Sequence, residues 1–303
     1  MANLEHVDAF RQGLDVWARF SQTIDEDADL SSEDFSGGAF AQAMLRKARL
    51  SRCAFIGADL RDADLREADL SEAAFDAASL IMANLGRAKA ASASFRETRL
   101  DGATLWKVSA VGADFRGANL TRAGMSSAKL DRADFRDADL AEAILERAKL
   151  RGAKFDRAKL DGAMLRNADL RDTSLRDAVL RDAVLDGSKL NARSFESVEL
   201  SGASLRQVSL SGAKFRNQAL VGVDFSGSDL TDASFYGCDL HDAKFTGAAL
   251  NRVDFSDAVG LTKPQLDEAA DFEEALLPDL LGAPLTNRER EVTGNVIRLV
   301  RRS

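Results

Sequence analysis

The side chains that most often carry out catalysis are scarce in this sequence and lie far apart in it. The only histidines are His6 and His241, and the only cysteines are Cys53 and Cys238. A catalytic centre needs such groups to converge with a base, a second thiol or metal ligands. No metal-ligand spacing, phosphate-binding loop, dinucleotide fingerprint or nucleophile elbow occurs. The sequence therefore predicts a protein that is not an enzyme and that uses no cofactor or metal.

Charged residues are the remaining source of chemistry, and acids outnumber bases among them. The 303 residues include 49 Asp and Glu against 41 Lys and Arg, for a formal net charge of −8. Because an acidic protein repels nucleic acid and anionic membranes, direct nucleic-acid binding is not expected. Too few Cys for a disulfide framework, no apolar run of 18 residues and no signal-peptide pattern together predict a cytoplasmic protein without a transmembrane segment.

The element that must position these charges is an internal repeat of five residues. From Leu30 to Phe255 every fifth residue falls in one register, and 43 of these 46 centres are Leu or Phe. Two residues earlier lies a small position, which is Ala in 31 units. Apolar residues two apart point to the same side of an extended segment, so each unit is predicted to be a short side followed by a corner. Gly at the second corner position of 14 units supplies the positive φ of a type II turn.

The phenylalanines indicate how many units make one coil. Eleven Phe share a spacing of twenty residues, interrupted only by Leu175: Phe35, Phe55, Phe75, Phe95, Phe115, Phe135, Phe155, Phe195, Phe215, Phe235 and Phe255. One unit in four thus differs from the rest, which predicts four walls per coil and about 11.5 coils for the 46 units. We name the walls by their centres: the Phe wall, the second wall from Phe40, the third wall from Leu45 and the fourth wall from Leu30.

The units also carry a recognisable signature. Ala58-Asp59-Leu60, Ala63-Asp64-Leu65 and Ala118-Asn119-Leu120 resemble the A(D/N)Lxx repeat of the pentapeptide-repeat family. The resemblance covers about three-quarters of the chain. It implies an all-β solenoid, a right-handed quadrilateral β-helix, and it is far more specific for this fold than for a function.

Helices are predicted to cover both ends of the coil, because an open end exposes unpaired backbone and core. Near the N-terminus, apolar residues recur every three or four positions and predict one helix over residues 4–20: Leu4, Val7, Phe10, Leu14 and Trp17. The predicted division is an N-terminal helical cap at 1–27, the β-helix at 28–258 and a C-terminal helical cap or tail at 259–303.

Two helices are predicted in the C-terminal segment. Thr262 and Pro264 have the types expected of an N-cap and a first helical turn. A second helix is predicted from Thr286, with Glu289 completing a capping box and an apolar face of Val292, Val296, Ile297, Leu299 and Val300. Three interpretations of that helix stay open: a basic helix end that complements its dipole, a homodimer contact, or a membrane-surface contact.

Outward positions of the third wall provide the candidate contact residues. Ile144, Met164 and Val184 recur there every twenty residues, Val179 flanks them, and Arg147 and Arg166 lie alongside. Interfaces favour apolar residues edged by Arg, although apolar side chains also simply improve ladder packing. A smaller second group is Ile81, Met82 and Trp106. Inside the coil, Arg193 and Gln218 occupy small positions and predict a local bulge or a side chain that escapes at a corner.

These features predict a non-enzymatic interaction or scaffold protein whose rigid, charged surface binds another protein. One alternative is a DNA mimic that binds gyrase. The family resemblance implies this possibility, because some quinolone-resistance members of the family act in that way. The acidic walls carry interspersed Arg and Lys, which weakens that interpretation. Another alternative is a component or effector of a bacterial secretion apparatus.

Overall fold

The computed structural model describes residues 2–24, 27–191, 195, 197–278, 288–293 and 296–301, the last two ranges by their backbone. The chain forms two compact units, which we call unit 1 (Met1–Lys159) and unit 2 (Leu160–Ser303). Unit 1 begins with two helices, α1 (Leu4–Arg11) and α2 (Leu14–Phe20). Unit 2 contains α3 (Lys263–Asp267), β1 (Leu276–Pro278), β2 (Arg288–Thr293) and β3 (Val296–Arg301). Arg193 lies outside the described residues.

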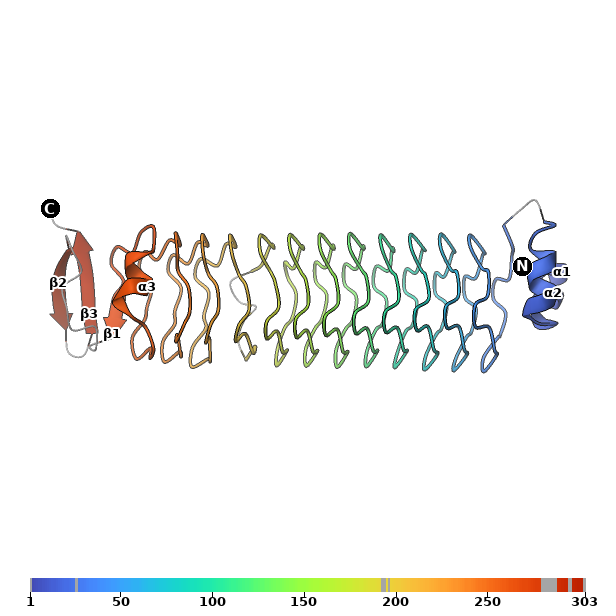
Figure 1. Ribbon diagram of the computed structural model, residues 1–303, viewed down its shortest axis with the longest axis horizontal. Helices are drawn as coiled ribbons and strands as arrows, with labels where there is room; N and C mark the ends of the chain where they lie inside the picture. Colours follow the sequence, from blue (N-terminus) through green and yellow to red (C-terminus); the bar gives the residue numbers. More distant parts are fainter. Residues whose placement is uncertain are drawn as a thin grey trace. The chain divides into compact units, whose positions relative to one another are not determined.

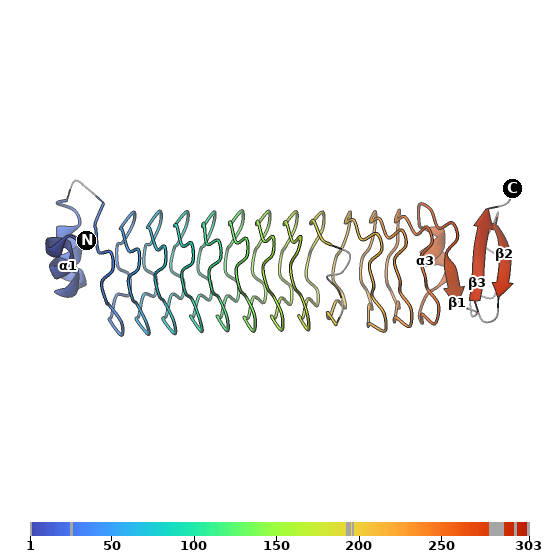
Figure 2. The same ribbon diagram turned by 180° about the vertical axis from the view of Figure 1, so that it is seen from behind.

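The backbone of unit 1 returns to the same place every twenty residues. Residues one before each centre form parallel pairs at this interval, from Asp29 with Arg49 to Asp139 with Lys159. Around each pair, hydrogen bonds link the coil to its neighbours, as when the Leu65 N–H donates to the Asn84 carbonyl at 2.8 Å. Figures 1 and 2 show these coils side by side, from blue to green. The period inferred from the phenylalanines is therefore the period of backbone pairing.

Every described corner of the repeat turns through a residue with positive φ, whether or not that residue is Gly. The angle is +64° at Gly102 and +58° at Asp62. For a residue with a Cβ this conformation costs about 1–2 kcal/mol. Hydrogen bonds offset that cost, because the Asp62 N–H donates to the Ile81 carbonyl of the next coil and the Ala63 N–H closes the turn onto Leu60. The glycines of the sequence thus mark only part of a conformation common to the corners.

The Asp or Asn of the repeat signature supports the corner that follows it. Oδ1 of Asp64 accepts the N–H of Arg66 at 3.1 Å, and Oδ1 of Asn119 accepts the N–H of Thr121 at 3.0 Å. Short side-chain acceptors stabilise turns in this way two residues before the donor. Many of the acidic residues therefore have a structural role. The other two signature positions point inward, where Ala fits the narrow interior and Leu or Phe fills it.

Stacked phenylalanine rings fill the Phe wall of unit 1. From Phe55 to Phe155, successive ring centroids lie 4.9–5.2 Å apart and the ring planes differ by 1–5°. These rings are completely buried. The twenty-residue spacing of Phe in the sequence corresponds to direct ring stacking.

The N-terminal segment forms two helices where the sequence predicted one. Gly13, with a φ of +114°, separates α1 from α2, because a helix cannot continue through that conformation. The Phe10 ring stacks on Phe40 with centroids 4.5 Å apart, and Nε1–H of Trp17 donates to the Met44 carbonyl at 2.8 Å. Both helices pack on the first coil in this way, although Leu4 is 73% exposed and takes no part in the buried face.

In unit 2 the coil continues past the last pentapeptide, which the sequence did not predict. Asp271 pairs with Ala249 and Leu276 pairs with Asp254, an interval of 22 residues where the repeat has 20. The helix α3 lies between the last pentapeptide and these pairs. Its start agrees with the prediction, since Thr262 is the N-cap and Pro264 lies in the first turn. Gln265 completes the capping box by accepting the N–H of Thr262 at 2.6 Å.

The second C-terminal helix, predicted from Thr286, is wrong. Thr286 lies outside the described residues, and the segment after it forms the antiparallel strands β2 and β3, which hold the backbone of Val292, Val296, Ile297, Leu299 and Val300. The sheet order is β1-β3-β2, so the strands extend from the last pass of the coil. The β-branched residues of this segment favour strands and lower helix propensity. A dimer through a C-terminal helix is therefore no longer supported.

Candidate protein-contact surface

Several polar side chains inside the coils donate hydrogen bonds to backbone carbonyls. The thiols of Cys53 and Cys238 donate to the carbonyls of Leu30 and Phe215, each at 2.9 Å and each 23 residues earlier. Thr98 and Ser228 use the carbonyl at the same offset. Gln218 donates from Nε2–H to the equivalent carbonyl of Phe195, so its half-buried side chain points inward and does not escape at a corner, which was one of the two predicted outcomes.

The chemical groups that could act as nucleophiles or bases are likewise engaged or isolated. Burial raises the pKa of the Cys53 thiol to about 11, which keeps it protonated near neutral pH. Nδ1 of His6 accepts the Asp29 N–H at 2.9 Å, and Nδ1 of His241 lies 2.6 Å from Oδ1 of Asp239. Among the residues that the structure describes, no group of three His, Cys, Asp or Glu side chains could hold a metal ion.

Many surface charges are paired with one another. Arg61 binds Asp59 and Arg66 binds Asp64, each pair within one pentapeptide, with N–O distances of 2.6 and 2.5 Å. The arginine hydrogen bonds lower the pKa of both carboxyl groups. Further pairs join successive coils, such as Arg157 with Asp137 at 2.7 Å. A carboxylate held in this way contributes little net negative potential to the surface.

One wall of unit 1 has more basic than acidic side chains even though some of its charges are paired, and we call it the basic wall. It comprises the third-wall units centred on Leu45, Leu65, Leu85, Leu105, Met125 and Leu145. Six basic and three acidic side chains give this wall a net charge of +3. It also carries three large apolar side chains that are exposed, Met44 (48%), Trp106 (39%) and Ile144 (38%). Apolar and cationic groups are thus presented together.

The predicted ladder of apolar residues falls in both units. In unit 2, Met164 and Val184 form a parallel pair, and both side chains are half-buried. In unit 1, Ile144 pairs with Gly124 and its side chain is exposed. Val179 is half-buried on the preceding wall, where it pairs with Glu199.

The arginines beside the ladder are both exposed. Arg147 occupies the corner after Leu145, with a φ of +56°. Nε of Arg166 lies 3.7 Å from Oδ2 of Asp186. Arg166 is therefore already paired with a carboxylate in the next coil of unit 2.

The second predicted group is divided between two edges of the basic wall. Ile81 and Met82 form the corner before the Leu85 unit, whereas Trp106 lies on the corner after Leu105. Met82 is 61% exposed, and a Cβ placed on Gly102 would lie 2.6 Å from its Sδ. Met82 thus covers the corner of the following coil at Gly102. Trp106 instead borders a cavity.

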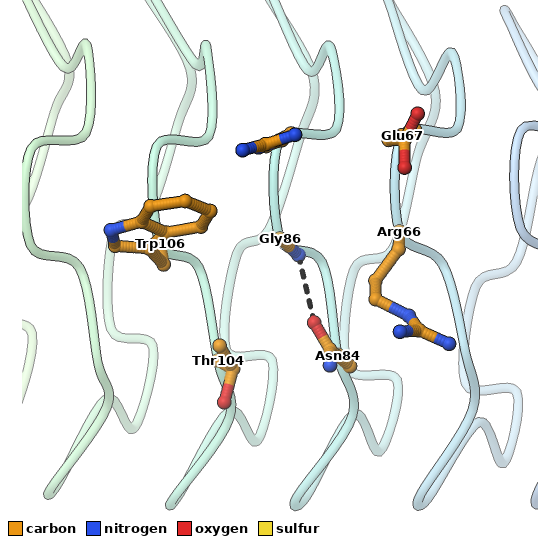
Figure 3. Close-up of a pocket in the computed structure, with 7 residues that line it drawn as sticks. Arg66, Glu67, Asn84, Gly86, Thr104 and Trp106 are labelled. Atoms are coloured by element: carbon orange, nitrogen blue, oxygen red, sulfur yellow. Dashed lines mark hydrogen bonds between the residues drawn. The ribbon is translucent and has the colours of Figure 1, made fainter.

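Trp106 borders a cavity of about 260 Å³ on the basic wall, shown in Figure 3. Its lining residues are Arg66, Glu67, Asn84, Gly86, Arg87, Thr104 and Trp106. The guanidinium carbon of Arg87 lies 4.9 Å from the Trp106 ring centroid, and Nζ of Lys107 lies 4.4 Å from it. Sequence reasoning identified Trp106 but missed Gly86, although Gly86 is the only Gly at the first corner position in the 46 units.

Family comparisons agree with the repeat geometry. The model described as a pentapeptide repeat region matches residues 28–105, and the model described as pentapeptide repeats, in 8 copies, matches 98–137, 133–172, 164–192 and 219–257. The protein belongs to the pentapeptide-repeat family. The predicted membership is confirmed, and with it the right-handed β-helix as the class of fold. No curated protein matches the chain.

Similar solved structures are also pentapeptide-repeat or fluoroquinolone-resistance proteins. HetL from the cyanobacterium Nostoc sp. strain PCC 7120, involved in heterocyst differentiation regulation, is 29% identical over 77% of this chain and 94% of its own, with a TM-score of 0.34. Trypsin-treated QnrB1, a plasmid-mediated fluoroquinolone resistance protein, is 17% identical over 64% and 89%, with a TM-score of 0.32. In the described part of this chain, no helix is long and apolar enough to cross a membrane.

Proposed function

We propose that this pentapeptide-repeat protein is a non-enzymatic scaffold that binds another protein through the basic wall of unit 1. The observation that carries the proposal is the coincidence, on one wall, of a net charge of +3 with the exposed side chains of Met44, Trp106 and Ile144. Apolar and aromatic residues together with Arg are the composition that protein interfaces favour.

Rigidity supports this role. The strand positions of the wall at Asp64, Asn84, Thr104 and Gly124 are held by backbone hydrogen bonds to both neighbouring coils, and those at Met44 and Ile144 by bonds to one, so the wall needs little further ordering when a partner binds. Binding surfaces that are ordered beforehand lose less conformational entropy on association. The helices α1 and α2 would serve as the cap that closes the first coil.

The gyrase-binding DNA mimic receives less support than the scaffold. A mimic must present an array of carboxylates comparable to a phosphate backbone, and several aspartates here are held by arginines: Asp59, Asp64, Asp134, Asp137 and Asp169. No observation specifically favours a secretion component or effector. The count of about 11.5 coils and the division into 1–27, 28–258 and 259–303 stay predictions.

Site-specific photo-crosslinking tests the proposal. A photoreactive amino acid replaces Ser126 on the basic wall and, in a matched control, Ser71 at the same corner position of the fourth wall. In extract from the native cells, we expect one discrete protein partner to be crosslinked from position 126 and none from position 71. Equal crosslinking from both positions, or none from either, would refute a partner site on this wall.

A further inference from the structure

The cavity beside Trp106 exists because Gly86 has no side chain. Gly86 occupies the first corner position, between Arg66 in the preceding coil and Trp106 in the following one. A Cβ at Gly86 would lie 3.0 Å from Oδ1 of Asn84 and 3.9 Å from the Trp106 carbonyl oxygen. Positive φ is a property of the second corner position, and Gly86 does not have it. The turn therefore does not require Gly here, and the consequence of Gly86 is open space.

A second glycine lies in the coil that follows Trp106. Gly124 is the only Gly in the 46 units at the position before a centre, and it pairs with Thr104 in the coil that carries Trp106. A Cβ on Gly124 would meet nothing within 4 Å. The next residue in the column of Trp106 is Ser126, which is also small. Small residues thus lie on both sides of the only outward-facing Trp of the repeat.

Some charged side chains around the cavity form ion pairs, and others instead contact the Trp106 ring. Arg66 is held by Asp64 at 2.5 Å, and Glu67 accepts from Arg46 at 2.7 Å. In the described chain, by contrast, the side chains of Arg87 and Lys107 contact the Trp106 ring and have no ion pair. Such cation–π contacts are weak at exposed sites, so they orient the ring while both cations remain available to an anion.

We propose that this cavity binds one aromatic side chain from an acidic segment of a partner protein. Its volume of about 260 Å³ lies below the usual range of small-molecule and cofactor sites, about 300–1,000 Å³, and suits a single large side chain. The indole of Trp106 offers a stacking surface, and carboxylates flanking the aromatic residue pair with Arg87 and Lys107. A single Trp without further aromatic platforms, on a protein of net charge −8, does not favour single-stranded nucleic acid.

The inference rests on the proposed function and is tested with a defined probe. A fluorescein-labelled nine-residue peptide with one central Phe among Asp and Glu is titrated with the full-length protein, and its polarisation is measured. We expect saturable binding that weakens about ten-fold or more when Phe is replaced by Ser, because aromatic anchors dominate such contacts. A peptide with Phe among Lys should not bind.

Variants of the protein locate the binding. Gly86→Leu fills the cavity and Trp106→Ala removes the stacking surface, and each should weaken binding of the acidic peptide about ten-fold or more. Ala141→Leu is the matched control, because the Ala141 N–H donates to Oδ1 of Asp139 at 3.0 Å just as the Gly86 N–H donates to Oδ1 of Asn84 at 3.0 Å. That control should bind within two-fold of the parent protein, and melting curves establish that all variants fold.

The inference is overturned if the acidic Phe peptide fails to bind, or if it binds Gly86→Leu and the parent protein equally. Tighter binding of an oligothymidylate than of the peptide would also overturn it, in favour of nucleic acid. Crosslinking from position 126 that persists in Gly86→Leu would contradict the Trp106 cavity alone, whereas absence of crosslinking from position 126 in the parent protein would count against the proposed scaffold itself.

Discussion

Units 1 and 2 are built from the same repeat but differ in how regularly their interiors are filled. In unit 1 the rings from Phe55 to Phe155 stack with planes within 5° of one another. In unit 2 the first stacked pair, Phe195 and Phe215, is tilted by 30° and the next two pairs by 10° and 11°, whereas unit 1 has a comparable tilt of 27° at its first pair, Phe35 and Phe55. The buried polar atoms of inward positions that lack a partner in the described chain, Oγ of Ser188 and Oε1 of Gln218, also belong to unit 2.

The same repeat therefore accommodates irregular residues, and the energetic cost of each depends on the neighbouring coils. Each inward side chain contacts its equivalents twenty residues before and after it, so a misfit also affects those neighbours. In unit 2, Phe225 and Phe245 form a second column, with centroids 5.6 Å apart, that packs edge-on to Phe235. These contacts offset part of the packing that the tilted rings of the Phe wall lose. We therefore expect unit 2 to open more readily than unit 1.

The largest effect is expected from removing a stacked ring. Phe135 has a parallel ring 4.9 Å away on both sides, so Phe135→Ala should lower the free energy of unfolding by about 3–5 kcal/mol. Phe195→Ala removes a ring with one tilted stacking partner at 5.3 Å and should cost less. Denaturant melts measure both values, and an equal or larger loss for Phe195→Ala would break the comparison.

Thiol labelling measures opening in each unit separately. Burial raises the pKa of Cys53 to about 11 and also raises that of Cys238, so both thiols should resist a disulfide reagent at pH 8 in the native protein. In mild denaturant we expect Cys238 of unit 2 to react about ten-fold faster than Cys53 of unit 1, because labelling follows local opening. Mass spectrometry of the labelled peptides gives the order, and earlier labelling of Cys53 would reverse the ranking.

An exchange of two inward residues tests the role of Gln218. Thr98 satisfies its hydroxyl on the Phe75 carbonyl at 2.7 Å, whereas Gln218 leaves Oε1 buried without a partner. Gln218→Thr should therefore raise the free energy of unfolding by about 1 kcal/mol, and Thr98→Gln should lower it by about 1–3 kcal/mol through overpacking. Chemical denaturation measures both, and stabilisation by Thr98→Gln would show that the inward position does not select for small residues.

The smallest effect is expected from surface ion pairs. Asp137 in unit 1 binds Arg157 and Asp232 in unit 2 binds Arg252, and both aspartates have positive φ, which Asn also tolerates. Asp137→Asn and Asp232→Asn should each leave the free energy of unfolding nearly unchanged, because exposed ion pairs contribute little to stability. Urea melts provide the measurement, and a clear difference between the two variants would mean that the units also differ at their surfaces.

Acid should act on both units alike. Arginine hydrogen bonds lower the pKa of Asp64 in unit 1 and of Asp169 in unit 2 below the ordinary value of 3.8. A carboxyl group whose folded pKa is lowered stabilises the fold above its unfolded pKa, and that contribution is lost as pH falls through the folded value. Melting temperature should thus be insensitive to these groups from pH 7 to about 5 and should fall below about pH 4. A loss of stability beginning near pH 6 would contradict this assignment.

The coil could be predicted from the order of the residues alone. A repeat of five residues without gaps assigns each residue a fixed environment, so period, inward positions and the stacked Phe column follow from spacing alone. The sequence also indicated the start of α3 from Thr262 and Pro264, because capping is a local interaction. Trp106 was recognisable as a contact candidate because the repeat places it at an outward position.

The places where the regular coil gives way to other contacts became visible only in the folded chain. The pairing of Leu276 with Asp254 and the strands β2 and β3 depend on hydrogen bonds between distant segments, which helical periodicity in the last residues could not reveal. The same holds for the cavity at Gly86, whose walls come from three successive coils. Which arginines are paired and which cations stay available is settled by contacts across the surface, because residues twenty apart in sequence are neighbours in space.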